Sequence, residues 1–153
     1  MFAKNLEDVH RPGVIAVDKE DKVVLIVEVT GYPFDSNREK TREYGILQLI
    51  DYLQESKTSI PFGMFVDLEK ILVFRWDGSK LSEVILSLNT VDVLSYYEPK
   101  FRDKQIFNAY LTGLIEAWIG DLCYRWKLEI PPALNEMAEI GLSQLLEGGL
   151  TQP

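Results

Sequence analysis

Two apolar stretches near the amino end of the chain, separated by a short polar segment, predict a β-hairpin. Residues 13–18 (GVIAVD) and 22–30 (KVVLIVEVT) are rich in β-branched side chains, and the polar residues between them fit a tight turn. Both stretches are apolar on both faces, as central strands covered on two sides are. We therefore expect a sheet, with a helix following to cover one of its faces.

The residues after this hairpin predict that helix, over 35–56. It follows a break at Gly31 and Pro33 and opens with Asp35 and Ser36, whose side chains can act as N-caps. At about 100° per residue, four apolar side chains form one stripe along it. They are Ile46, Leu49, Ile50 and Leu53. This stripe is expected to pack on the sheet.

Apolar and β-branched residues further along the chain predict two more strands, over 62–67 and 70–76, joined by a short polar turn. The turn signal Asp77-Gly78 then precedes an extended segment near 82–88. Together with the first hairpin, these segments predict an α/β fold with a central sheet of four or five strands.

Two helices are expected in the carboxy-terminal part, over 103–127 and 132–147. The first carries an apolar arc broad enough for more than one surface to cover it. The arc consists of Phe107, Leu111, Leu114, Trp118 and Leu122, with Ile106, Tyr110 and Ile115 nearby. Pro131-Pro132 separates the two helices, and the tail after Gly149 is expected to fray.

Length and composition indicate one globular domain. The chain has 153 residues, of which 46% are hydrophobic and 26% charged, and this suffices for a single core. We expect one domain over residues 1–150, with its core over about 11–100. The formal net charge of −8 opposes nonspecific attraction to nucleic acid, so such a role would need a local basic patch.

Cysteine and histidine content limits the chemistry further. Cys123 is the single cysteine and His10 the single histidine, which excludes an intrachain disulfide and a histidine-rich metal site. Cys123 is expected to be a small buried residue. The sequence has neither a signal-peptide core nor a run of about 18 apolar residues. The expected setting is the reducing cytoplasm, without membrane contact.

Glu28 is the residue that the apolar pattern does not explain, because a carboxylate within a buried strand is costly. If the hairpin turn takes residues 19–22, paired residue numbers sum to 41 and Gly13 stands opposite Glu28. A carboxylate at position 13 would then meet Glu28 across the ladder. Thr30 lies two residues further along and shares the face of Glu28.

This hairpin resembles that of PD-(D/E)XK nuclease-like proteins, in which Pro-Asp starts one strand and Glu-x-Lys ends the next. Pro12-Gly13 and Glu28-Val29-Thr30 occupy those places here. In such enzymes the two carboxylates hold a divalent metal such as Mg²⁺, and the lysine orients the attacking water. Gly13 and Thr30 replace two of these groups. The resemblance implies a restriction-endonuclease-like fold with a mixed sheet and a degenerate site, in which Glu28 is the remaining metal ligand.

The resemblance continues into the following helix, where Gln48 and Tyr52 are similar to the Gln-x-x-x-Tyr element of RecB-like nucleases and of the amino-terminal nuclease domains of type I restriction subunits. It covers about residues 11 to 76, in the order hairpin, helix, hairpin. By the angular estimate, Gln48 and Tyr52 lie away from the apolar stripe. A migrated cation would come from Lys40 or Arg38.

The same residues also allow simpler interpretations. Glu28 can reach solvent or pair with Arg11 or Arg38, Thr30 is a good strand former, and Gln48 and Lys40 suit a solvated helix face. Tyr52 can be a packing residue. Asp18 and Asp35 are the alternatives for a second carboxylate, with Asp18 at the far end of its strand and Asp35 equally suited to be an N-cap. Tryptophans 76, 118 and 126 are expected in the core or in an interface.

Three functions follow as hypotheses. The first is a catalytically inactive member of this superfamily, with no cofactor, that acts through protein contacts or as a homodimer formed by its carboxy-terminal helices. The second is a Mg²⁺-dependent DNA endonuclease with a rearranged site. The third keeps nucleic-acid binding without chemistry, which the charge of −8 disfavours.

Overall fold

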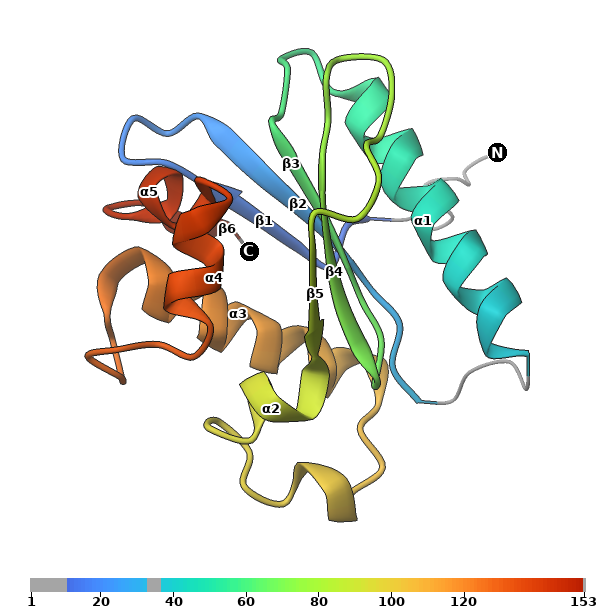
Figure 1. Ribbon diagram of the computed structural model, residues 1–153, viewed down its shortest axis with the longest axis vertical. Coiled ribbons are helices and arrows are strands. Elements are labelled where there is room, and N and C mark those ends of the chain that lie inside the picture. Colours follow the sequence, from blue (N-terminus) through green and yellow to red (C-terminus); the bar gives the residue numbers. More distant parts are fainter. Residues whose placement is uncertain (1–10, 33–36, 153) are drawn as a thin grey trace, which may run out of the picture.

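The computed structural model describes residues 11–32 and 37–152 as an α/β fold built on one open, mixed sheet of six strands (Figure 1). The strand order is β5-β4-β3-β2-β1-β6. The strands are β1 (Val14–Val17), β2 (Val23–Val29), β3 (Phe62–Val66), β4 (Lys70–Arg75), β5 (Leu86–Asn89) and β6 (Leu150–Gln152). The helices are α1 (Arg38–Glu55), α2 (Thr90–Leu94), η2 (Phe101–Asp103), α3 (Asn108–Tyr124), α4 (Leu134–Glu139) and α5 (Leu142–Leu146).

The two predicted hairpins are present, and the expected register holds in most of the first one. Val14 pairs with Val27 and Ala16 with Leu25, so their numbers sum to 41 as expected. A β-bulge then shifts the ladder, and Val17 rather than Asp18 is the partner of Val23. The carboxylate of Asp18 instead accepts hydrogen bonds at 2.9 Å from the backbone N–H groups of residues 20 and 22 in the turn. The N–H of Asp18 donates to the carbonyl of Lys22 at 2.8 Å, so the backbone bonding continues into the turn in the shifted register.

The helix α1 connects β2 to β3, which run parallel to each other, and it covers one face of the sheet (Figure 1). Its N-cap is Asn37, whose side chain accepts a hydrogen bond from the backbone N–H of Lys40. The proposed caps Asp35 and Ser36 lie outside the described residues. The expected stripe does face the sheet: Leu49 and Leu53 are buried, and Ile46 and Ile50 pack at the edge of the same cluster.

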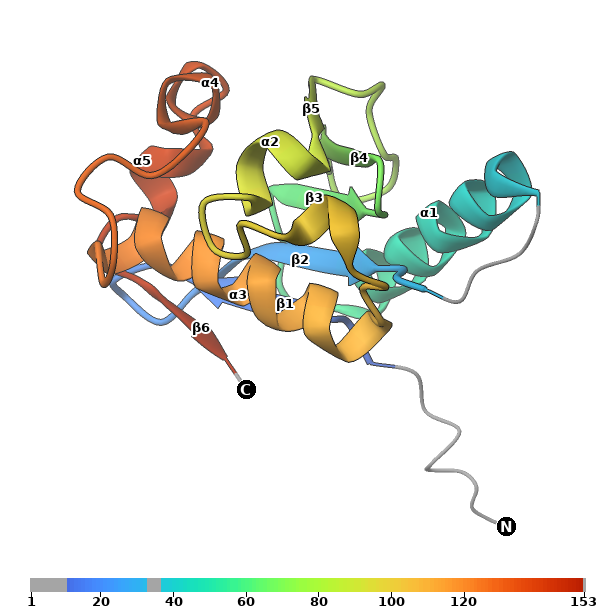
Figure 2. The same ribbon diagram turned by 90° about the horizontal axis from the view of Figure 1, so that it is seen from below.

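The other face of the sheet is covered by α3, with α2, α4 and α5 beside it (Figure 2). Much of the broad apolar arc of α3 is buried within the chain, because the helix contacts strands on one side and α5 and α2 on others. Its buried apolar side chains are Leu111, Leu114, Ile115, Trp118, Ile119, Leu122 and Cys123. Phe107 and Tyr110, which the arc included, are exposed.

The expected start of this helix at residue 103 is wrong, since α3 begins at Asn108. The preceding residues run beside the end of β2, where the N–H of Tyr32 donates to the carbonyl of Ile106 at 2.7 Å. The side chain of Asn108 accepts a hydrogen bond from the N–H of Gly31 at 2.8 Å. These tertiary hydrogen bonds hold the segment extended where periodicity alone favours a helix.

The predicted final helix is divided in two, and the predicted frayed tail is a strand. Gly141 adopts a φ of 86° between α4 and α5, a left-handed conformation that ends the first helix. The tail after Gly149 pairs antiparallel with β1 as β6, which adds the sixth strand. No helix in the described part of the chain is long and apolar enough to cross a membrane.

Candidate functional site

Glu28 lies near the carboxyl end of β2, on the sheet face that α1 covers. It is only 5% exposed, and its partner in the parallel ladder is Phe65 of β3. The neighbouring side chains of Val27 and Val29 point to the opposite face, into the cluster beneath α3. The simpler interpretation of Glu28 as a carboxylate that reaches solvent is therefore wrong.

Tyr52 is a side chain of α1 whose pKa is affected by the charge of Glu28. It packs against the cluster between α1 and the sheet. Burial, and then the negative charge of Glu28, raise the pKa of the Tyr52 hydroxyl well above its ordinary value. The angular estimate that placed Tyr52 away from the apolar stripe is thus wrong, because Tyr52 flanks the buried side of the helix. Gln48, one turn earlier, is half-buried on the same flank.

Gly13 does not offer a position from which a carboxylate would meet Glu28. Its N–H donates to the carbonyl of Val27 at 2.9 Å, one residue short of the predicted pairing. A Cβ added at Gly13 would lie 2.8 Å from Cγ2 of Val29, whose side chain belongs to the α3 face. A side chain at position 13 would therefore contact Val29 on the face opposite Glu28.

Thr30 follows Glu28 on the α1 face, where the family pattern has a lysine. Its N–H donates to the carbonyl of Val66 at 2.9 Å, which continues the parallel ladder. Its side chain borders a cavity of about 10 Å³ together with Arg38, Thr41 and Asp67. A space of this size accepts one water molecule at most. Among the described residues that line this cavity with Thr30, the cationic one is Arg38.

An ion-pair network holds Arg38 and its neighbour Arg42 in place. Arg38 pairs with Glu69 at 2.7 Å. Nε and an Nη of Arg42 both donate to Oδ2 of Asp67, at 2.9 and 2.7 Å. Oδ1 of Asp67 accepts the backbone N–H groups of residues 69 and 70. Both oxygens of Asp67 therefore have partners within the protein.

Lys40, the other candidate for a migrated cation, is exposed. At about 100° per residue its side chain points away from the buried Gly45 and Leu49. It does not accompany Glu28. Asp35 and His10 lie outside the described residues. Within the ranges 11–32 and 37–152, no three His, Cys, Asp or Glu side chains lie together as a metal site.

Two buried carboxylates were missed in the sequence. Asp121 of α3 is fully buried, and it accepts hydrogen bonds from the hydroxyl of Tyr97 at 2.6 Å and the N–H of Lys127 at 2.7 Å. Burial, and then the bond to Asp121, raise the pKa of Tyr97. The signal was the same as for Glu28: one carboxylate in an otherwise apolar run. Asp121 fixes the loop after α3.

Glu98 is the second. Lys104 pairs with it at 2.7 Å, and Tyr110 also donates to it. These bonds, the one from Lys104 first, lower the pKa of Glu98 to about 2. They tie the segment before α3 to the start of that helix. Cys123 is buried, which confirms the prediction for this residue. Its burial raises the pKa of the thiol to about 11.

Comparison with known proteins adds no relative to this description: the chain matches no family model, no curated protein and no solved structure.

Proposed function

We propose that this chain is a non-catalytic PD-(D/E)XK nuclease-like protein that acts by binding a second copy of itself. The observation that carries the proposal is the position of Glu28, buried between β2 and α1. A carboxylate held there serves the packing of the helix on the sheet. It is not presented to a metal ion and a phosphodiester at the surface.

Two features support the nuclease-like part of the proposal. The order hairpin, helix, hairpin is the order that the resemblance requires. Tyr52 of the Gln-x-x-x-Tyr element and Glu28 of the strand motif are close enough for the charge of Glu28 to raise the pKa of Tyr52. This charge effect between two motif residues that are well separated in sequence supports the resemblance.

Two further positions argue against chemistry at this site. Thr30 has a hydroxyl where a positively charged amine would orient water, and the nearby Arg38 is paired with Glu69. Position 13 faces Val29 and not Glu28. A metal-dependent nuclease needs converging carboxylates and a cation, and among the described residues no group of three His, Cys, Asp or Glu side chains that could hold a metal surrounds Glu28.

The outer face of α3 supports self-association. Its middle carries small residues, because Ala109, Gly113 and Ala117 follow one another at intervals of four, and a Cβ at Gly113 would meet no atom within 4 Å. The indole of Trp126 borders this stretch and donates to the carbonyl of Ala117 at 2.8 Å. Its ends carry exposed aromatic rings, Tyr110 at 43% and Tyr124 at 52%. In an antiparallel pair of helices with a twofold axis beside Ala117, Tyr124 of one copy would lie against Tyr110 of the other.

The absence of catalysis is tested with plasmid and single-stranded DNA in the presence of Mg²⁺ or Mn²⁺. We expect no cutting by the wild-type protein above the level of Glu28→Gln, purified in the same way. Metal-dependent cutting that Glu28→Gln abolishes would instead establish the endonuclease hypothesis. Binding to DNA that weakens steeply with salt would support the nucleic-acid hypothesis.

Self-association is tested by light scattering over a range of protein concentrations. Wild type and Gly113→Ala are expected to dimerise, and Gly113→Arg to remain monomeric, because a long charged side chain cannot fit between two helices that pack closely. Leu47→Lys, on the exposed face of α1, is the matched control and should dimerise like wild type. A monomeric wild type at high concentration would contradict the proposal, as would dimerisation of a folded Gly113→Arg variant.

A further inference from the structure

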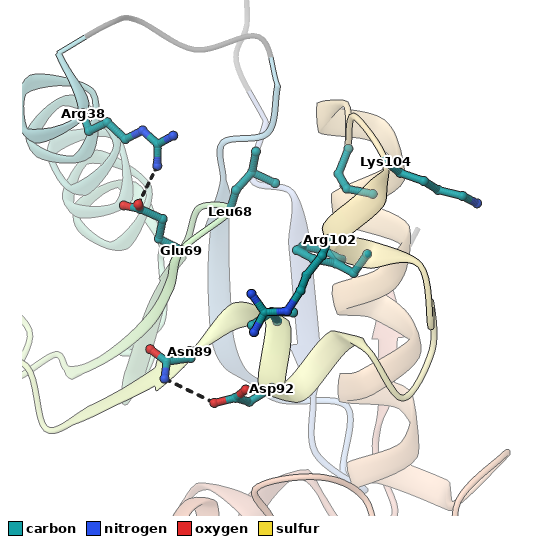
Figure 3. Close-up of a pocket in the computed structure, with 10 residues that line it drawn as sticks. Arg38, Leu68, Glu69, Asn89, Asp92, Arg102 and Lys104 are labelled. Atoms are coloured by element: carbon teal, nitrogen blue, oxygen red, sulfur yellow. Dashed lines mark hydrogen bonds and ion pairs between the residues drawn. The ribbon is translucent and has the colours of Figure 1, made fainter.

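A cavity of about 510 Å³ opens where the two parallel strands β2 and β3 end, next to the start of α1 (Figure 3). Its walls come from α1, from the turn between β3 and β4, from the junction of β5 with α2, and from η2 and the residues after it. Segments widely separated in sequence thus meet around one space. Its volume lies within the roughly 300–1,000 Å³ of ligand pockets, and open α/β sheets bind ligands at the carboxyl ends of their parallel strands.

Most of the charged side chains around this cavity form an ion pair or a hydrogen bond with another residue of the protein. Arg38 and Glu69 pair with each other at 2.7 Å. Asp92 accepts a hydrogen bond from Asn89 at 3.2 Å, and Lys104 is held by Glu98. The close-up shows Lys104 extended away from the other labelled residues (Figure 3). Each of these charges therefore has a partner supplied by the fold.

Arg102 is the exception. Its side chain extends from η2 toward the start of α2, across the cavity (Figure 3). It is exposed and makes no ion pair with any residue that the structure describes. A guanidinium group offers five N–H donors in a planar fork that matches a carboxylate or a phosphate. Arg102 is thus positioned to receive an anionic group that enters the cavity.

The rest of the lining is apolar. Leu68 and Val91 are partly exposed and supply its accessible apolar surface, while Phe101 and Ile106 also line it but are buried, at 6% and 1% exposure. A cation facing an apolar wall selects a ligand with an anionic group at one end and a hydrocarbon or aromatic group at the other. A fully polar ion, such as inorganic phosphate, would leave the apolar wall without a partner.

We propose that this cavity binds a small organic anion, a carboxylate or a phosphate monoester with an apolar part. Its charged group lies on Arg102, and its apolar group lies against Leu68 and Val91. The lining carries three cationic side chains, Arg38, Arg102 and Lys104, and two carboxylates, Glu69 and Asp92. Arg38, Glu69 and Lys104 are engaged in ion pairs, which leaves Arg102 to receive the anion. Arg102 is not part of the nuclease-like motif, so the proposal is independent of the proposed function.

The test is a titration of ¹⁵N-labelled protein, followed by amide NMR, with three probes: benzoate, phenyl phosphate and inorganic phosphate. Saturable shifts are expected with benzoate or phenyl phosphate, confined to residues 68–69, 89–92 and 101–106, and which of the two binds more tightly identifies the anionic group. Inorganic phosphate should bind at least about tenfold more weakly than phenyl phosphate, because it buries no ring. Benzylamine, of similar shape but positive charge, should cause no saturable shift.

The variant Arg102→Gln separates this site from binding elsewhere. This variant should bind the preferred probe about tenfold or more less tightly, because it lacks a charge-assisted hydrogen bond. Its spectrum should otherwise remain that of the folded wild type. Arg11→Gln, which removes another exposed arginine, should leave the affinity unchanged. Equal affinity of Arg102→Gln and wild type would overturn the proposal. So would shifts centred outside the cavity, or no saturable shift with either organic anion.

Discussion

The two faces of the sheet are covered in different ways. On one face α1 is the helix that the described residues supply, and its buried contacts come from Gly45, Leu49 and Leu53. On the other face α3 contributes more buried side chains, and α2 and α5 pack beside it. The described part of the α1 side is one helix on the strands, whereas several helices pack together on the α3 side.

Each face also contains a buried carboxylate, and the surroundings of the two differ. Asp121 on the α3 side is surrounded by donors from the loop after the helix and from Tyr97, so its role is to hold that loop. Glu28 on the α1 side is buried, and its negative charge helps to raise the pKa of Tyr52 of α1. On both faces, a carboxylate in an apolar run thus lies where two elements of the fold pack together. Of these two carboxylates, Glu28 is the one that coincides with the nuclease-like motif.

The largest expected effect comes from the centre of the α3 side. Trp118 is fully buried, and its indole N–H donates to the carbonyl of Pro132 at 2.9 Å. Trp118→Ala should lower the free energy of unfolding by about 3–5 kcal/mol. Urea denaturation at 25 °C measures this. The control is Trp126→Ala, at a half-exposed tryptophan, which should cost clearly less. Equal losses would show that this side is not packed as described.

A smaller loss is expected where α1 touches the sheet. A Cβ at Gly45 would overlap with Cε1 of the Phe65 ring and lie 2.9 Å from its Cδ1. Overpacking of this kind outweighs the helix propensity of alanine, so Gly45→Ala should destabilise the protein by about 1–2 kcal/mol. The same urea titration measures the loss. The double variant with Phe65→Leu should recover part of it, and an undiminished stability of Gly45→Ala would mean that α1 lies further from the sheet.

The smallest effect has the opposite sign and comes from the outer face of α3. Gly113 lies within the helix, and a Cβ there meets no atom within 4 Å. Gly113→Ala should therefore stabilise the protein by about 0.5–1 kcal/mol, because alanine loses less backbone entropy in a helix. Urea denaturation at a low protein concentration keeps association out of the measurement. A loss of stability would show that this face is already covered within one molecule.

The candidate site was predictable in part. The pattern around Glu28 was visible because a carboxylate in a β-branched run is rare, and the shared face of Glu28 and Thr30 follows from strand alternation. The partial burial of Tyr52 against the sheet was not predictable, because the apolar stripe alone does not show how far the contact surface of α1 extends around the helix. The direction in which a side chain at position 13 would point depends on the hydrogen bond from Gly13 to Val27, which departs from the ideal ladder. The cavity around Arg102 has no local signal at all, since its walls come from distant segments.

Local chemistry determined much of the architecture of this chain. The strands, the helix α1 with its buried stripe, the burial of Cys123 and most of the first hairpin's register all follow from periodicity, turn residues and alternation, because these depend only on neighbours in the sequence. Tertiary structure decided the rest. It delayed the start of α3 through hydrogen bonds with Gly31 and Tyr32, and turned the last residues into a strand because β1 offered an unpaired edge. A backbone group takes the partner that the whole fold supplies, and no local pattern records which partner that is.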